Sequence, residues 1–286
     1  MSQRFLPDRS QPVHVPLEYH LPIVASSDPA AGAQNLSDDG SQFEVQLDTP
    51  IVIPKEAKNC VIRVLQAQVW WTIPNIVTGV NDQFRCTYDD GILEVTQQVT
   101  IPQGLYDLDA LNQAIDVQLQ AVGFPEGLFT LIADNATQKV IIQANDPYAT
   151  TGLRIDFTIS NSIREILGFD SQLLPAGGNT TQQEQFIGDN TANFNTVNSL
   201  LIHSDLTSRG ILVNNTYNQS IVQVVPDVEV GSLITFRPFQ PLRIPCPDLQ
   251  GATRNSLRFW LTSEVNERVD TAGEYWNVNL EISYYV

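Results

Sequence analysis

From residue 199 to the end of the chain, hydrophobic and polar residues alternate, and no helical periodicity recurs. An alternation of period two is typical of strands that bury one face and expose the other. Glycine, proline and asparagine separate the strand candidates, as they do in all-β proteins. The candidates are 199–205, 211–213, 220–228, 233–238, 242–244, 256–262 and 276–285. This part of the chain is therefore predicted to be an antiparallel β domain.

Two more strand candidates lie earlier in the chain, at 43–53 and 61–73. Pro54 and Pro74 end them, because proline cannot donate a ladder hydrogen bond. Two strands before a long interruption and about six after it give roughly eight, the number that a jelly roll needs. We predict a mainly β fold, a single eight-stranded antiparallel jelly roll with the form of a two-sheet β-sandwich. Its last strand is expected to pair deep in one sheet.

The interruption, residues 84–172, has a different pattern. An apolar stripe with helical spacing runs through it, and its members are Leu108, Leu111, Ile115, Leu119 and Val122. Asp107 has the side chain of an N-cap, and Gly123 is a stop signal. Strand candidates at 92–95, 99–101, 129–132, 140–143 and 153–159 and a short helix at 161–167 accompany this helix. We predict a small α+β domain inserted after the second strand, followed by a long loop through residue 195.

The first 42 residues contain five regularly spaced prolines and then a small polar stretch. Prolines at this spacing disfavour both an α-helix and the hydrogen-bond ladder of a sheet. We therefore predict an extended N-terminal arm and linker. Val13, Val15, Leu17, Tyr19 and Leu21 alternate with other residues, a pattern that would let the arm dock along another chain. A disordered terminus is the alternative. The predicted domains are the arm at 1–42, the jelly roll at 43–83 and 173–286, and the inserted α+β domain at 84–172.

The charge of the chain limits its partners. The 286 residues contain 15 Lys and Arg against 32 Asp and Glu, a formal net charge of −17. Repulsion from phosphate argues against direct contact with nucleic acid. Only 16% of the residues are charged, against about 25% in an average soluble domain. This composition fits a surface partly covered by neighbours, and it fits equally well an extracellular-type β protein with a polar surface.

Residues with metal-binding or nucleophilic chemistry are few and scattered. Cys60, Cys86 and Cys246 have no CxxC spacing, so we expect free thiols from a reducing compartment. His14 and His20 fall in the arm, and His203 falls in a strand beside Asp205. Neither a nucleophile-elbow nor a Walker spacing occurs. No signal peptide or membrane span is indicated.

Paired carboxylates could in principle make a glycosidase, because jelly-roll enzymes that act on sugars use two of them. Glu264, Glu267, Asp270 and Glu274 cluster before the last strand, but in a loop, where solvated charges are the simpler interpretation. Four tryptophans fall in predicted strands, and the adjacent Trp70 and Trp71 must point to opposite faces. We predict no catalytic, cofactor-binding or metal-binding residue and no cofactor.

Several short motifs resemble the penton proteins of virophages and polinton-like viruses. They are Ile-Pro-Gln-Gly-Leu-Tyr-Asp-Leu-Asp-Ala-Leu-Asn at 101–112, Ile-Leu-Gly-Phe at 166–169, and the segments 231–241, 257–262 and 270–276. The resemblance covers about residues 43–286. It implies a single jelly roll standing upright at a fivefold vertex of an icosahedral capsid, with the inserted domain outward. It also implies a homopentamer among hexon-like double-jelly-roll major capsid proteins of a dsDNA virus.

We therefore expect a structural capsid protein that is assembled in a host cell and located at the capsid vertex of the virion. Further potential partners are a vertex spike, minor capsid proteins or an internal membrane. We expect no direct contact with nucleic acid. The alternative is a receptor- or glycan-binding surface protein that uses the inserted domain as its binding head, and a carbohydrate-active enzyme is a distant third. In a closed ring, Asp and Glu should be scarce on the faces between subunits unless an Arg opposes them.

Overall fold

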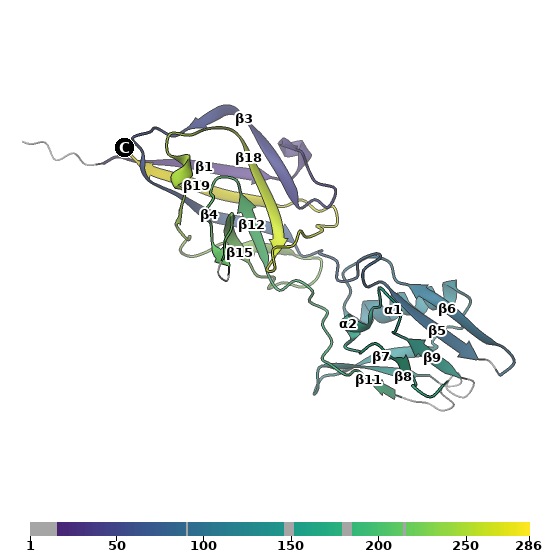
Figure 1. Cartoon of the computed structure of the whole chain (residues 1–286). Coiled ribbons are helices and arrows are strands. Elements are labelled where there is room, and N and C mark those ends of the chain that lie inside the picture. The colour runs from purple at the N-terminus through teal and green to yellow at the C-terminus, as the bar shows by residue number, and fades with distance from the viewer. Residues whose placement is uncertain (1–15, 90, 146–151, 179–184, 214–215) are drawn as a thin grey trace, which may run out of the picture.

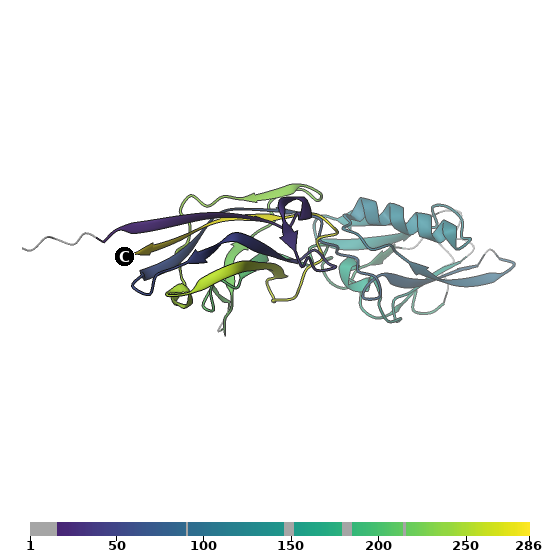
Figure 2. The same cartoon turned by 90° about the horizontal axis from the view of Figure 1, so that it is seen from above.

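The computed structural model describes residues 16–89, 91–145, 152–178, 185–213 and 216–286. The chain forms two units that lie end to end (Figure 1, Figure 2). The larger unit is an antiparallel β-sandwich, and the smaller one, which we call the head, combines two small sheets with helices. Figure 1 places the C-terminus at the end of the sandwich that faces away from the head.

One sheet of the sandwich has the order β1-β19-β4-β16, and β17 also pairs with β4. Its strands are β1 (Glu18–Ser26), β4 (Lys58–Trp70), β16 (Leu233–Phe236), β17 (Ile244–Pro245) and β19 (Asn277–Tyr285). β19 pairs with β1 on one side and with β4 on the other. The expectation that the last strand lies deep in a sheet is confirmed.

The second sheet has the order β15-β12-β18-β3-β2. Its strands are β2 (Ala33–Gln34), β3 (Gln42–Val52), β12 (Leu200–Ser204), β15 (Ser220–Val224) and β18 (Thr253–Ser263). The short pair β13 (Leu212–Val213) and β14 (Thr216–Tyr217) and the 3-10 turns η1 (Pro29–Ala31) and η3 (Pro247–Leu249) complete the unit. The result is a mainly β, sandwich-like fold that resembles a jelly roll.

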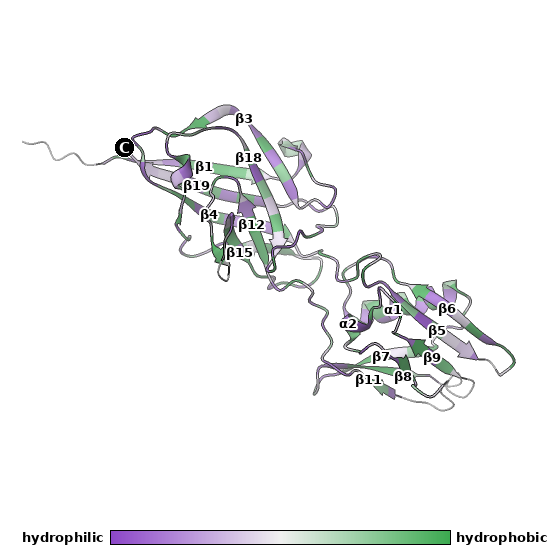
Figure 3. Cartoon of the chain, in the orientation of Figure 1, coloured by the Kyte–Doolittle hydropathy of each residue, from purple (hydrophilic) through white to green (hydrophobic). Residues whose placement is uncertain are grey.

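Alternating side chains from both sheets fill the space between them. Ile62 and Val64 of β4 and Leu280 of β19 point inward from one sheet, and Leu257 and Phe259 of β18 point inward from the other. Figure 3 shows this alternation of hydrophobic and hydrophilic residues along the strands. Burial of the inward face is what stabilises each strand in this register, since a slip by one residue would turn that face to solvent.

The position of β1 corrects two expectations. Residues 18–26 were expected to lie in an extended arm, but they pair with β19 along its whole length, from Glu18 opposite Tyr285 to Ser26 opposite Asn277. Pro22 is tolerated because β1 is an edge strand. Without the short β2 and β17, the two sheets contain eight main strands. Three of them, β1, β3 and β4, precede the inserted segment, which therefore follows the third strand and not the second. Residues 1–15, including His14, lie outside the described residues.

The head contains two small sheets, β10-β9-β5-β6 and β11-β8-β7. Its strands are β5 (Gln83–Asp89), β6 (Glu94–Thr100), β7 (Phe129–Asp134), β8 (Lys139–Ala144), β9 (Leu153–Asp156), β10 (Leu173–Leu174) and β11 (Gln185–Ile187). The helices are α1 (Leu108–Ala121) and α2 (Arg164–Leu167). The segment expected to be a loop from residue 173 onward thus contributes two short strands to these sheets.

Helix α1 confirms the predicted helical stripe. The Asp107 carboxylate accepts a hydrogen bond from the Ala110 amide, which makes it the N-cap, and Leu111, Ile115 and Leu119 are buried. They pack with Phe84 and other residues of the head in a core of its own, separate from the core of the sandwich. Two cores in one chain mean that the two units can respond separately to mutation.

Candidate functional surfaces

His203 lies on the outer side of β12 and is buried, with 1% of its surface exposed. Its Nε2 is 2.8 Å from the Thr262 hydroxyl oxygen, and its ring stacks on Trp260 with the centroids 5.2 Å apart. The Arg268 guanidinium lies over the Trp260 ring, with its Cζ 5.5 Å from the ring centroid. Burial, with a contribution from the Arg268 charge, lowers the pKa of His203 to about 4. The histidine is therefore a packed, neutral side chain whose partner is a threonine.

Two of the four acids before β19 bind different segments of the chain. Glu264 accepts hydrogen bonds from the Asn198 and Ser199 amides, whereas Asp270 accepts one from the Gln103 side chain. Burial raises the pKa of Glu264, but the hydrogen bonds from Asn198 and from backbone amides lower it more. These two carboxylates therefore hold loops in place.

The thiols are buried in two different places. Cys86 lies in the head, whereas Cys60 and Cys246 lie together at one end of the sandwich, where the Cys246 amide donates to the Cys60 carbonyl. Burial, with the neighbouring Cys60 and Asp248, raises the pKa of Cys246 to about 12. A thiol held neutral in this way is a poor nucleophile. Among the described residues no group of His, Cys, Asp and Glu side chains could hold a metal ion.

The tryptophans confirm the expected opposition of Trp70 and Trp71. Trp71 is buried in the core of the sandwich, and Trp70 is 37% exposed on the other side. Trp276 is buried, and its indole N–H donates to the Gly40 carbonyl at 3.1 Å. None of these side chains belongs to a row of exposed aromatic rings, so the arrangement within the described chain offers no sugar-stacking platform.

His20 joins a charged network on the outer face of the sandwich. Its Nδ1 is 3.2 Å from a Glu281 oxygen, and the same oxygen is 3.2 Å from Arg63 Nη1. Glu18 lies 3.6 Å from Arg63 Nη2. The network connects β1, β19 and β4 across the sheet. It is a structural feature of this end of the sandwich, since Arg63 lies beside the carboxylates of both Glu18 and Glu281.

The head is joined to the sandwich by a buried amide. Asn75 is 1% exposed, and its Nδ2 donates to the Tyr106 carbonyl at 2.7 Å and to the Phe194 carbonyl at 3.0 Å. Its Oδ1 accepts from the Tyr106 amide at 2.9 Å. Asn75 thus fixes the incoming segment, the 104–106 segment and the outgoing segment to one another. A lone polar residue before a strand gives no sequence signal for this function.

A further hydrogen bond fixes the head against the sandwich: the Gln103 side chain donates to Asp270 at 2.8 Å. Next to it, on the sandwich side, the Thr72 hydroxyl donates to the Thr271 carbonyl at 3.0 Å. Leu105, from the head side of the junction, packs against the sandwich core. The connection is therefore built from specific contacts, and it holds the head at one end of the sandwich.

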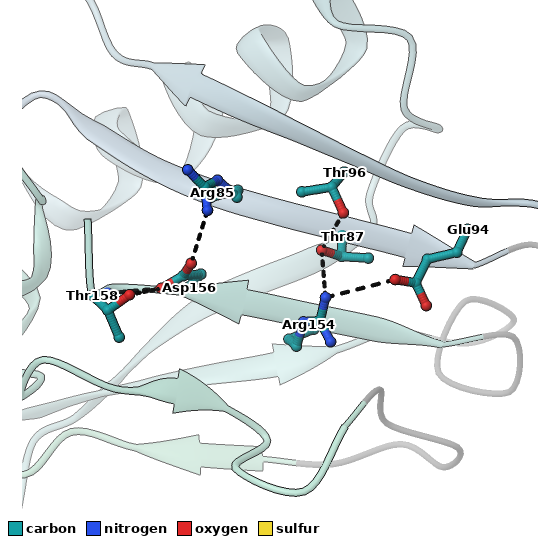
Figure 4. Close-up of polar contacts among 7 residues, drawn as sticks. All are labelled: Arg85, Thr87, Glu94, Thr96, Arg154, Asp156 and Thr158. Carbon is teal, nitrogen blue, oxygen red and sulfur yellow. Dashed lines mark hydrogen bonds and ion pairs between the residues drawn. The ribbon is translucent and has the colours of Figure 1, made fainter.

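One sheet of the head presents a polar outer face, drawn in Figure 4. Arg85 Nη1 lies 3.5 Å from Asp156, and Arg154 Nη2 lies 3.6 Å from Glu94 and 3.4 Å from the Thr87 hydroxyl. The side chains come from β5, β6 and β9, which are adjacent strands. Exposed ion pairs of this kind contribute little to stability. They give the outer face of this sheet a polar character.

The edge of the sandwich between β15 and β16 carries an apolar groove of about 310 Å³. Beside it Phe239 is fully exposed, at 106%. Sequence reasoning did not single this residue out, although its position between Pro238 and Pro241 marks it as a loop aromatic.

No described helix is long and apolar enough to cross a membrane. No protein-family model and no curated protein matches the chain. Among solved structures it is similar to the mavirus penton protein, with 12% identity, a TM-score of 0.48 and coverage of 94% of this chain and 100% of that one. A lectin from Bauhinia forficata in complex with GalNAc aligns over 95% of this chain and 99% of its own, with 9% identity and a TM-score of 0.16.

Proposed function

We propose that this chain is a structural capsid protein that forms the pentameric vertex capsomer, or penton, of an icosahedral shell. The observation that carries the proposal is the placement of the two units. The head lies at one end of the sandwich, and the C-terminus and the start of β1 lie at the other (Figure 1). A ring of upright copies would present every head on one side of a shell and every C-terminus on the other.

The sandwich has the parts that such a ring requires. Its eight main strands have the jelly-roll order, with the insertion between the third and fourth of them. A closed ring needs two different edges on each copy, one to meet the preceding subunit and one to meet the next. The edge formed by β1, β2 and β3 and the edge formed by β15 and β16 lie at opposite ends of the strand orders. The sequence motifs that resemble penton proteins support the same function.

The penton function assigns partners to these surfaces. The sandwich would contact its siblings and the surrounding hexon-like capsomers, and the head would face outward, where a spike could mount. Shape is the mechanism: closure of five subunits sets the curvature at the vertex. His20, His203, Glu264 and Asp270 each contact a side chain or an amide of the fold, in keeping with a protein that works by assembly.

Mass and shape in solution test this proposal. The purified chain should form a species of five times the 31.8 kDa chain mass, and electron microscopy should show rings with five heads on one side. A chain that stays monomeric or trimeric at high concentration contradicts the penton assignment.

The alternative is a receptor- or glycan-binding protein with the head as its binding surface. The observation in its favour is the polar face of Figure 4, whose Arg85 and Glu94 side chains are exposed. A glycan array and a cell-binding assay with the wild type and with an Arg85→Ala, Arg154→Ala double variant test it. Binding that the double variant loses, while ring formation persists, would add this function to the capsid function. Absence of binding by the wild type contradicts it.

A further inference from the structure

The β15–β16 edge, which we define as β15, β16 and the loop 237–243, contains an apolar hollow open to solvent. The groove is lined by Val64, Ile221, Val222, Phe236, Pro238 and Leu242. Phe239 projects beside it and is fully exposed. Exposure of so large an apolar side chain forgoes the free energy that its burial would release. An exposed phenylalanine beside an apolar groove on one edge indicates a surface that a partner covers.

The opposite edge, which we define as β1, β2 and β3, is also partly apolar. Val24 is 71% exposed, and Leu17 and Tyr19 are exposed as well. They lie on or next to β1, the outermost strand of its sheet. An unpaired edge strand with apolar side chains is a site where another chain packs.

The two edges differ in charge. The β1–β3 edge falls within residues 16–54, which contain acids but no Lys or Arg; the acids are Glu18, Asp28, Asp38, Asp39, Glu44 and Asp48. The β15–β16 edge carries Arg237 and Arg243, both exposed, and its acids, Asp227 and Glu229, lie on the loop 225–232 that connects the two strands. Within the described part of the chain neither has a carboxylate within salt-bridge distance, although Arg237 donates to Gln66 at 2.8 Å. The acidic edge of one copy therefore complements the edge with unpaired arginines on another.

The strand register places these features at the same height. β16 ends at Phe236, opposite Ala67, and β17 begins at Ile244, opposite Ile62. β19 continues both rows of paired residues to β1. Ala67 lies opposite Val278, which lies opposite Ala25, and Ile62 lies opposite Ile282, which lies opposite Leu21. The loop with Phe239 therefore lies level with residues 21–25 on the far edge, which include Val24. In a ring whose axis runs parallel to the long axis of the sandwich, each copy is related to the next by a rotation about that axis. The rotation leaves the position of a residue along the axis unchanged, so residues at the same level on the two edges meet.

We propose that the β15–β16 edge of one copy, with Phe239 at its centre, binds the β1–β3 edge of a second copy around Val24. The contact is heterologous, since a different surface of each copy takes part. This inference rests on the proposed capsid function and names the surfaces that close its ring.

Two single substitutions on the full chain test the contact. Phe239→Asp destroys one edge and leaves the other intact, and Val24→Asp does the reverse. Each variant alone should need at least about tenfold more protein to assemble than the wild type. Both side chains are exposed, so tryptophan fluorescence and circular dichroism should remain those of the folded chain. Val117→Asp, on an exposed position of α1, is the matched control and should assemble normally.

An equimolar mixture of the two variants gives the sharper result. The intact β1–β3 edge of the Phe239→Asp chain should bind the intact β15–β16 edge of the Val24→Asp chain, and both remaining edges are blocked. Native mass spectrometry should therefore detect a one-to-one heterodimer and no ring.

Other outcomes separate the two proposals. Rings formed by either variant alone, dimers of Val24→Asp alone, or a mixture without heterodimer would overturn this contact and leave the capsid function standing. A wild-type chain that never assembles would overturn both.

Discussion

At the scale of single residues, the packing around His203 is the clearest case of a reactive side chain used for structure. Thr262, Trp260 and Arg268 surround a site from which water is excluded. The charged imidazolium is disfavoured there by burial and by the nearby Arg268 charge, which together lower the pKa to about 4. The free imidazole has a pKa of about 6.5. The difference makes the stability of the sandwich depend on pH.

The sign of that dependence follows from proton binding. Above about pH 6.5 the imidazole is neutral in both states, so it has no effect. As the pH falls from there towards about 4, the unfolded chain binds a proton that the folded chain refuses. The free energy of unfolding should therefore decrease over this window, by at most about 3 kcal/mol from this group.

His203→Gln should remove this contribution while keeping a polar group for Thr262. Urea unfolding followed by tryptophan fluorescence, at about pH 7 and about pH 4.5, measures it. The wild type should lose about 2–3 kcal/mol more than the variant between the two pH values. Equal losses would show that His203 is accessible to protons in the folded state. The sequence predicted a strand position for this residue, but its burial depends on Trp260, Thr262 and Arg268, which lie more than 50 positions away in the sequence.

At the scale of elements, β1 and α1 illustrate how far local pattern predicts structure. The stripe of α1 lies within 14 residues, and the Asp107 cap is adjacent to it, so local information is enough. The alternation in residues 13–21 also indicated a strand, but not its partner. That partner, β19, lies at the other end of the sequence, and no local pattern specifies such a pairing.

Truncation tests whether β1 belongs to the sandwich. A chain that begins at Ser27 loses β1, whose Ala25 is buried and whose Leu21 and Ile23 pack against the core. Its unfolding free energy should fall by at least about 3 kcal/mol, and exposure of β19 should promote aggregation. A chain that begins at Pro16 is the control. Equal fluorescence-monitored unfolding of the two chains would contradict the pairing.

Substitution in α1 tests whether the head has its own core. Leu111→Ala leaves a cavity at a fully buried position and should destabilise the head by about 2–5 kcal/mol. Val117→Ala, at an exposed position of the same helix, should cost less than about 0.5 kcal/mol. Circular dichroism at the helix band follows the head. Tryptophan fluorescence should not change, because Trp70, Trp71, Trp260 and Trp276 all lie outside it; a coupled shift would argue against separate cores.

At the scale of the whole molecule, the head is an insertion whose two ends meet at Asn75. That residue binds the carbonyl of Phe194, so the incoming and outgoing segments lie side by side. The sandwich strands on either side of the insertion, β4 and β12, pair with later strands of the sandwich, not with the head: β4 pairs with β16, β17 and β19, and β12 pairs with β15 and β18. Assembly through the sandwich edges therefore should not require the head.

Replacement of residues 77–193 by a short Gly-Ser linker tests this. The headless chain should keep the tryptophan fluorescence of the sandwich and should still form rings. It loses the Gln103–Asp270 hydrogen bond and the packing of Leu105, so a stability loss of about 1–2 kcal/mol is expected. A headless chain that folds but stays monomeric would place the assembly contacts on the head.

The sequence by itself determined the elements whose causes are local. Alternation specified the β class and most strands of the sandwich, helical spacing specified α1, and the scattered Cys and His residues already argued against a metal or nucleophilic site. Only the tertiary structure decided that residues 18–26 complete the sandwich, that the insertion follows the third strand, and that Asn75 joins the two units. It alone placed Phe239 and Val24 level with each other on opposite edges. These facts depend on pairings between distant segments, where burial of a shared core, and not local preference, selects the partner.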